Sequence, residues 1–266
     1  MVIITGKKRI PDIILTLFLF SAVIIVILPV ICTIGKSFTP DAPRTEFKFT
    51  GYFDFFIWKP LYLKAFLNSV LIAGTASLGS AVIALFASYV FAKVKFRGRE
   101  ILFYLYIIVM MTPFQVTLLP QYIVSKRLLI YDTPAALILP GIFTPFAVFL
   151  LTQIVKTIPD YLIEAAGLET KSTFIIIIKI ILPQIKTGLI CAIVLNFTEY
   201  WNMAAEPLVL METVSGFPLS LRIPEMLSKG DAGAAAASVL FLIPPLLLYL
   251  FFKDEIVDGL AGYKLK

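Results

Sequence analysis

The sequence predicts an all-α polytopic membrane protein with six transmembrane helices. Of its 266 residues, 59% are hydrophobic and only 15% are charged, a balance far outside the range of soluble domains. Long apolar runs alternate with shorter polar connections, whereas a transmembrane barrel would show short segments of alternating polarity. Since backbone polar groups need partners inside lipid, the apolar runs are expected to be helices.

Each expected span is an apolar run long enough to cross the hydrocarbon core, which takes roughly 20 residues. The first run follows Lys7, Lys8 and Arg9 but lacks a small-residue cleavage site, so we interpret it as an uncleaved first helix. The chain is expected to form one transmembrane domain over residues 1–266. The expected spans cover about 10–34, 68–92, 101–123, 134–154, 185–210 and 234–252.

Lysine and arginine are unevenly shared between the two sides of the expected bundle. The N-terminus, the connections after the second and fourth spans and the C-terminal tail hold 14 of the 23 basic residues, and the other side holds nine. Basic loops near span ends are retained in the cytoplasm. Both termini are therefore expected to be cytoplasmic. This topology accounts for the net charge of +6, and no basic soluble domain suggests a nucleic-acid partner.

The residue types argue against chemistry on this chain. Histidine, the usual general base and metal ligand, is absent, and the two cysteines, Cys32 and Cys191, show no metal-type spacing. No nucleophile elbow, zinc-protease motif or phosphate-binding loop occurs. We expect no catalytic residue, no metal and no cofactor bound by this chain.

The fourth connection, about 155–184, is the longest on the expected cytoplasmic side. Pro159 and Asp160 form a helix start, with the aspartate side chain available to cap free N–H groups of the next turn. A short helix over residues 161–166 is expected to follow. Gly167 is expected to close it in a left-handed conformation, where glycine carries no side-chain penalty.

The apolar run from Phe174 to Leu182 is too short to cross a membrane, and Lys179 lies within it and Pro183 behind it. We expect a second helix there, leading into the fifth span. The connection then presents a helix, a turn and a helix, with small side chains at Ala165 and Ala166 beside the charge of Glu164. Such an element is typical of a docking site for a partner.

This connection resembles the EAA loop of ABC importer permeases. Two positions depart from the family pattern, because Glu169 stands where aspartate is usual and Thr170 where glycine is usual. The resemblance extends over nearly the whole chain, through LNS at 67–69, KVKFRGRE at 93–100, TPFQVTLLPQY at 112–122, YWN at 200–202 and the tail from Asp258, and it narrows to the maltose-type branch, smaller permease subunit. The EAA pattern is carried by Glu164, Ala165, Ala166, Ile180, Leu182 and Pro183.

The resemblance implies a type I ABC importer permease fold in a bacterial-type cytoplasmic membrane. It implies a second, non-identical permease chain, two ABC ATPase subunits that bind ATP and Mg, and an extracytoplasmic solute-binding protein. The substrate would be a sugar or oligosaccharide, and this chain would supply half of the pathway. The implied ATPase-coupling residues are Glu164, Ala165, Ala166, Gly167, Glu169, Thr170, Leu182 and Pro183.

Polar side chains in the fifth span indicate contact with the translocated solute. Intramembrane polar groups are costly, and carbohydrate sites combine aromatic faces with amide or carboxylate groups. The alternative is that Tyr200 and Asn202 bridge helices and that Glu206 lies at the outer interface. The possible pathway residues are Asn196, Glu199, Tyr200, Trp201 and Asn202.

Three other function classes account for less of the sequence. A permease for glycerol phosphate or another small polar solute is the nearest alternative, because the same motifs occur across that branch. A secondary transporter would show an inverted repeat, which the two halves of this chain lack. A membrane-embedded enzyme would need facing acids or histidines, whereas Glu199 and Glu206 lie seven residues apart with no partner motif.

Overall fold

The computed structural model describes residues 10–38, 49–231 and 233–260, and this part of the chain contains helices and no strand. The basic residues expected at the termini, Lys7, Lys8, Arg9, Lys264 and Lys266, lie outside the described residues. The bounds of the helices are α1 Ile10–Phe38, α2 Thr50–Phe53, the π-helix η1 Asp54–Trp58, α3 Pro60–Lys93, α4 Arg99–Met110, α5 Phe114–Arg127, α6 Pro134–Ile142, α7 Pro145–Thr157, α8 Asp160–Glu169, α9 Thr173–Ile176, the π-helix η2 Ile177–Ile181, α10 Leu182–Asn202, α11 Ala205–Leu210, the 3-10 helix η3 Val214–Gly216, α12 Leu219–Ser228 and α13 Gly233–Leu260.

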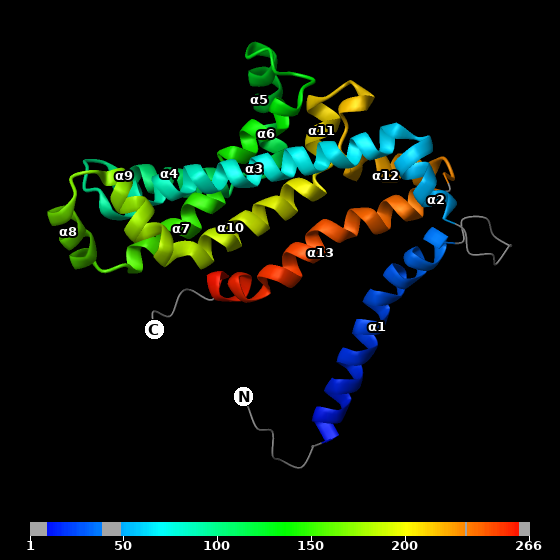
Figure 1. Ribbon diagram of the computed structural model, residues 1–266, viewed down its shortest axis with the longest axis horizontal. Coiled ribbons are helices and arrows are strands. Elements are labelled where there is room, and N and C mark those ends of the chain that lie inside the picture. The colour runs from blue at the N-terminus through cyan, green and yellow to red at the C-terminus, as the bar shows by residue number, and fades with distance from the viewer. Residues whose placement is uncertain (1–9, 39–48, 232, 261–266) are drawn as a thin grey trace.

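Five segments of the described chain are long and apolar enough to cross a membrane: Leu15–Phe38, Pro60–Lys93, Pro134–Thr157, Thr173–Asn202 and Gly233–Gly259. They correspond to the first, second, fourth, fifth and sixth expected spans. The prediction of a polytopic all-α membrane protein is confirmed. Of these segments, α3, α10 and α13 run side by side roughly along one axis, with α8 at one end and α2 and α12 at the other (Figure 1). We call these the α8 end and the α12 end.

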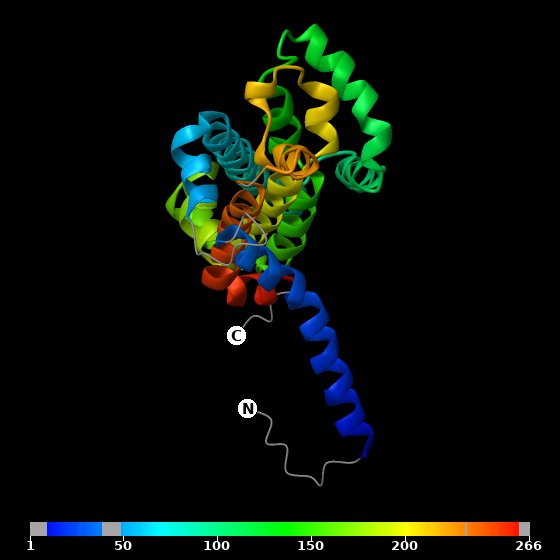
Figure 2. The same cartoon turned by 90° about the vertical axis from the view of Figure 1, so that its right-hand side faces the viewer.

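The expected third span, 101–123, is not one straight helix. It divides into α4 and α5, which bend by 101° at the break, so the chain holds six spans only if this bent pair is counted as one. Pro113 precedes α5 in an extended conformation and carries no N–H to continue the α4 ladder. The bend turns α5 away from the bundle, where it lies beside α11 (Figure 2).

The core lies where α3 packs against α6, α7 and α10. Small residues recur every fourth position on α3, and Ala76, Ser80, Ala84 and Ser88 are all buried. Small side chains allow close backbone approach, which is what holds helices together in lipid. The larger side chains of α7 and of the η2–α10 segment fill the space opposite, among them Leu151, Val155, Ile177, Ile181 and Ile185.

The first helix, α1, is nearly separate from this core. It packs on α13 and α2 near the α12 end and then diverges from the bundle (Figures 1 and 2). Nearly all its described side chains are exposed, including Cys32, while Cys191 on α10 is buried.

Candidate coupling helix and pathway cavity

The fourth connection forms a projecting helix at the α8 end. Lys93, the last residue of α3, donates hydrogen bonds to the carbonyl of Ile158 at 2.5 Å and to Asp160 Oδ1 at 2.7 Å. The Lys93 side chain is only 8% exposed, so this ion pair fixes the start of α8 against the end of α3. The hydrogen bond from Lys93 lowers the pKa of Asp160 below its ordinary value. The expected capping role of Asp160 is wrong, because its carboxylate holds Lys93 and caps no backbone group of α8.

Helix α8 has a buried side and a broad exposed side. Ala166 is buried, and Leu162 and Ile163 pack against the main core. Glu164 and Ala165 are exposed, as are the aromatic ring of Tyr161 and the Leu168 side chain, which is 91% exposed. This exposed side therefore carries two large apolar side chains, Tyr161 and Leu168, next to the charge of Glu164.

The turn after α8 differs from the expectation for Gly167. Gly167 lies inside the helix, which continues to Glu169, and it is not among the glycines with positive φ. The helix ends instead at Thr170, whose φ of −147° and ψ of 138° are extended. The Thr170 hydroxyl accepts a hydrogen bond from the N–H of Ser172 at 3.2 Å. Threonine therefore suits the position where the family has glycine, because no left-handed residue is required.

The second helix of this connection and the fifth span form one continuous segment, Thr173–Asn202. The helix expected at Phe174–Leu182 leads into the fifth span, and the span therefore begins earlier than the expected residue 185. The wider π-turn of η2 precedes Pro183, and the N–H of Leu182 bonds to the carbonyl of Ile177. The π-turn shifts the hydrogen-bond register just where Pro183 supplies no N–H, so the helix passes the proline unbroken. Leu182 packs on the core and Pro183 is exposed.

Two of the possible pathway residues lie inside the protein. Asn196 is 1% exposed; its amide donates to Ser80 Oγ at 2.8 Å and to the carbonyls of Gly141 and Ala76, and its oxygen accepts from Thr144 Oγ1 at 3.2 Å. Trp201 is fully buried and donates to the carbonyl of Phe241 on α13 at 3.0 Å. Both side chains connect helices, so the expectation that they face a solute is corrected.

The other candidates are on the surface. Asn202 is exposed and its amide donates to the carbonyl of Thr198 within the same helix, so it bridges no helices. Glu199 is exposed and Tyr200 is half-buried. Both line a cavity of about 300 Å³ beside the break between α10 and α11. At the break, Met203 and Ala204 leave the helical conformation.

This cavity brings Phe114 of α5 next to polar residues on both sides of the α10–α11 break. Its lining carries two carboxylates, Glu199 and Glu206, one on each side of the helix break, and no basic residue. The ring of Tyr200 and the side chain of Phe114, which begins α5, supply aromatic faces. Phe114 was not singled out from the sequence, because only the bend after Pro113 carries α5 over the end of α10. The cavity lining is Phe114, Glu199, Tyr200, Met203, Ala204, Ala205 and Glu206.

The carboxylate of Asp132 joins the connection after α5 to the connection after α11. Asp132, between α5 and α6, accepts from the N–H groups of Glu212 and Thr213 at 2.8 Å each and from the Thr213 hydroxyl at 2.5 Å. These bonds lower the pKa of Asp132, the hydroxyl of Thr213 contributing most. Asp132 itself has a φ of 59°, a left-handed conformation that aspartate tolerates better than most residues. The connections that follow α5 and α11 are thereby held together.

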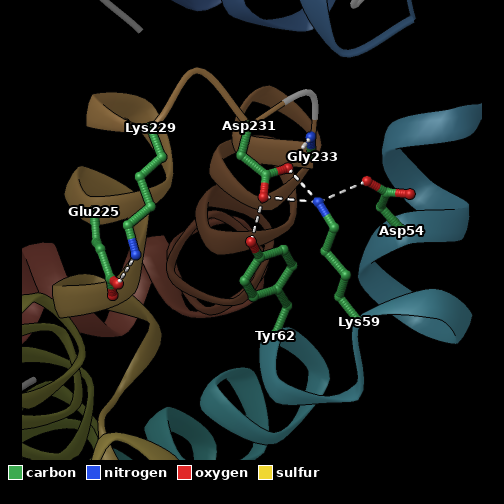
Figure 3. A network of polar contacts seen from close by, with 7 residues as sticks. All are labelled: Asp54, Lys59, Tyr62, Glu225, Lys229, Asp231 and Gly233. Atoms are coloured by element: carbon green, nitrogen blue, oxygen red, sulfur yellow. Dashed lines mark hydrogen bonds and ion pairs between the residues drawn. The ribbon is translucent and has the colours of Figure 1, made fainter.

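A second charged cluster joins the α12 end (Figure 3). Lys59, just before α3, donates to Asp231 Oδ2 at 2.7 Å and lies 3.0 Å from Asp54 Oδ2, while Tyr62 and the N–H of Gly233 also donate to Asp231. Burial opposes the charge of Lys59, but the hydrogen bonds to Asp231 and Asp54 outweigh it and raise its pKa. Burial likewise opposes the charge of Asp231, and its donors outweigh that to lower its pKa. We call the side chains of Asp54, Lys59, Tyr62 and Asp231 the Asp231 clamp.

Comparison with known proteins identifies the family of the chain. Residues 80–259 match the family described as binding-protein-dependent transport system inner membrane component. The chain belongs to this family. It is a multi-pass inner membrane permease of a binding-protein-dependent ABC importer, a non-catalytic component that works with a binding protein. Among the described residues, no group of three or more Cys, Asp or Glu side chains is placed to hold a metal ion.

Individual relatives resemble the permease over most of its length. The arabinooligosaccharides transport system permease protein AraQ of Bacillus subtilis strain 168 is 28% identical over 265 residues, 93% of each chain. The sn-glycerol-3-phosphate transport system permease protein UgpE of Shigella flexneri serotype 5b is 29% identical over 205 residues, 75% of this chain and 73% of that one. A crystal structure of a bacterial ABC transporter involved in import of the acidic polysaccharide alginate has a chain of the same fold, with a TM-score of 0.81 at 16% identity over 96% of this chain and 99% of that one.

Proposed function

We propose that this permease imports a neutral sugar or oligosaccharide and that α8 couples it to an ABC ATPase. The observation that carries the proposal is the exposed face of α8, where Glu164 and Ala165 lie beside the bare side chains of Tyr161 and Leu168. A groove on the ATPase would receive this face. Glu164 would pair with a cation of the ATPase, because a charge-assisted hydrogen bond at an apolar contact gives both strength and register.

The α8 end is then the cytoplasmic end, and both termini are cytoplasmic. The excess of basic residues on that side supports the orientation. The remaining partners are a second, non-identical permease chain, two copies of the ATPase and an external solute-binding protein. Movement of α8 would reach the core through its two firm attachments, the Lys93–Asp160 ion pair and the continuous η2–α10 helix.

The cavity beside the α10–α11 break is the proposed solute contact. Its aromatic faces suit the apolar ring hydrogens of a sugar, and its carboxylates suit hydroxyl donors. The two negative charges, with no cation among the lining residues, disfavour an anionic solute such as glycerol phosphate. An arabinooligosaccharide, the substrate named for one relative, is uncharged and therefore fits better.

The first experiment is to tag the C-terminus, extract the protein in mild detergent and identify the chains that co-purify by mass spectrometry. An ABC ATPase together with a second permease chain is the expected result. A homo-oligomer without any ATPase would contradict the proposal. In proteoliposomes of the complete transporter, Glu164→Lys should leave ATP hydrolysis in place while solute uptake falls to background. Asp254→Lys, an exposed site on α13, is the matched control and should transport normally.

Solute class is tested in the same vesicles by comparing uptake of a neutral oligosaccharide with uptake of sn-glycerol 3-phosphate, each with its binding protein. Only the neutral solute should enter. Glu199→Gln and Glu206→Gln should alter uptake of the sugar without altering assembly with the ATPase. Uptake of glycerol phosphate alone would favour the second candidate function.

A further inference from the structure

The connection between α3 and α4 carries a basic cavity that the proposed function does not use. The cavity, about 310 Å³, lies at the α8 end and is lined by Lys95, Phe96, Gly98, Arg99, Glu100 and Ile101. Its rim is charged and its walls include two large apolar side chains. Both ends of this connection are ends of membrane-spanning helices, so the cavity lies at the level where lipid headgroups meet water.

The charge of this connection is strongly positive. Lys93, Lys95, Arg97 and Arg99 stand within seven residues, and Glu100 is the acidic residue among them. Lys93 is engaged by Asp160 and Arg99 by Glu100, at 2.7 Å each. Lys95 and Arg97 are exposed and form no ion pair with any described residue. Two cations at this corner are therefore available to a ligand.

The cavity continues into an apolar surface. Ile101, which lines it, is 67% exposed, and the same helix exposes Leu102, Leu105 and Ile108 at half or more of their surface. An acidic protein loop would gain little from such a surface, whereas a lipid would place its headgroup at Lys95 and its acyl chains along α4. We propose that this corner binds the phosphate headgroup of an anionic phospholipid, with Lys95 at the phosphate, Arg97 adding positive charge beside the cavity, and Phe96 and Ile101 against the glycerol and acyl carbons.

The site would also bear on coupling, because Lys95 lies two residues from Lys93, which fixes α8. A lipid held at Lys95 would restrain the last turn of α3 and with it the start of α8. An anionic lipid is thus expected to stabilise the attachment of the coupling helix. This consequence does not depend on which solute is carried.

Native mass spectrometry of the intact transporter tests the site, with phosphatidylglycerol and phosphatidylcholine titrated separately. Phosphatidylglycerol should be retained preferentially. Lys95→Gln should weaken its retention about fivefold, the effect of removing one basic residue at an anionic surface. Glu100→Gln should strengthen it. Lys186→Gln, which removes an exposed cation at the same end outside the cavity, should change nothing.

Two further arms separate other occupants. Inorganic phosphate should not displace the lipid, because it lacks the acyl chains that contact Ile101; displacement at equal concentration would make this a phosphate site and overturn the proposal. A photoactivatable phosphatidylglycerol should cross-link to peptides covering residues 94–105. Cross-linking of Lys95 to the ATPase instead, or equal retention of both lipids by wild type and Lys95→Gln, would also overturn it. Because Lys95 is exposed and forms no ion pair with a described residue, its replacement is expected to leave the fold intact.

Discussion

Lys93 at the end of α3 and Asp160 at the start of α8 form an ion pair with a nitrogen-to-oxygen distance of 2.7 Å. The two residues are 67 positions apart in the chain, and the Lys93 side chain is almost entirely buried while that of Asp160 is 73% exposed. A buried lysine needs a partner, because an unpaired charge in a poorly solvated place is costly. The pair therefore sets where α8 leaves the bundle.

Removing this attachment should loosen α8. In Lys93→Gln we expect faster hydrogen exchange of the α8 amides and reduced solute uptake per ATP hydrolysed. Lys171→Gln, an exposed cation in the turn after α8, is the control and should exchange like wild type. Because the pKa of Asp160 is lowered, the pair is complete at neutral pH and is lost only as the pH falls below the ordinary aspartate pKa of 3.8. Exchange rates in Lys93→Gln that match wild type at neutral pH would refute the attachment.

Asn196 should matter for folding rather than for solute contact. Its four hydrogen bonds join α3, α10 and the α6–α7 break, and replacing it with leucine would leave the Ser80 and Thr144 hydroxyls without this partner. A lost buried hydrogen-bond partner costs about 1–3 kcal/mol. Thermal unfolding of Asn196→Leu in detergent should therefore begin at a lower temperature. Asn202→Leu, which affects one bond at an exposed site, should unfold like wild type. If Asn202→Leu unfolds at a lower temperature than Asn196→Leu, the buried hydrogen bonds of Asn196 do not hold the helices together, and a solute-facing role for Asn196 is again open to test.

The sequence predicted the spans well because their signal is length and hydropathy, which a bilayer imposes on each helix separately. The predicted span bounds were wrong where a single proline could either bend the chain or leave the helix unbroken. Pro113 ends α4 and turns α5 through 101°, whereas Pro183 interrupts nothing, because a π-turn absorbs it. A proline in a sequence indicates a missing N–H but not how the neighbouring turns respond.

The candidate site was predictable in part for a similar reason. The local sequence pattern predicted a short helix here, and Glu164 and Ala165 lie on the exposed side of that helix, α8. The polar residues of the fifth span were ambiguous, since burial depends on helices far away in the chain. Asn196 and Trp201 meet α3 and α13 and become structural, while Glu199 meets the bend before Phe114 and lines a cavity.

The Asp231 clamp should hold the α12 end together over a wide pH range. Because the pKa of Asp231 is lowered, its contribution to stability is fully present above pH 3.8, the ordinary value. That contribution is lost as the pH falls through the lowered pKa. Because the pKa of Lys59 is raised, its contribution to stability is fully present below pH 10.5, the ordinary value. That contribution is lost as the pH rises through the raised pKa. Stability from the clamp should thus be flat between about pH 4 and pH 10.

Asp231→Asn should remove this contribution. The expected loss is about 1–3 kcal/mol, because Lys59 and Tyr62 lose their charged partner. Thermal unfolding at pH 7 measures it, with Asp254→Asn as the control at an exposed site. A melting temperature of Asp231→Asn equal to that of the control would show that the clamp contributes nothing.

Gly141 offers the most direct test of how closely α6 packs against the core. A Cβ added to Gly141 would lie 2.6 Å from the Cβ of Ala76 and 2.7 Å from the ring of Tyr200, distances at which something must move. Alanine in a helix is favoured over glycine by about 1 kcal/mol, but overpacking costs typically about 1–3 kcal/mol, so the sterics should prevail. Gly141→Ala is therefore expected to lower the unfolding temperature and to displace Tyr200 from the cavity wall. Gly74→Ala is the matched control, because it lies in α3 with nothing within 4 Å of the added carbon and should be neutral or stabilising. If the two variants unfold at the same temperature, α6 does not approach α3 as closely as the structure indicates. The position of Tyr200 in the cavity wall would then be wrong as well.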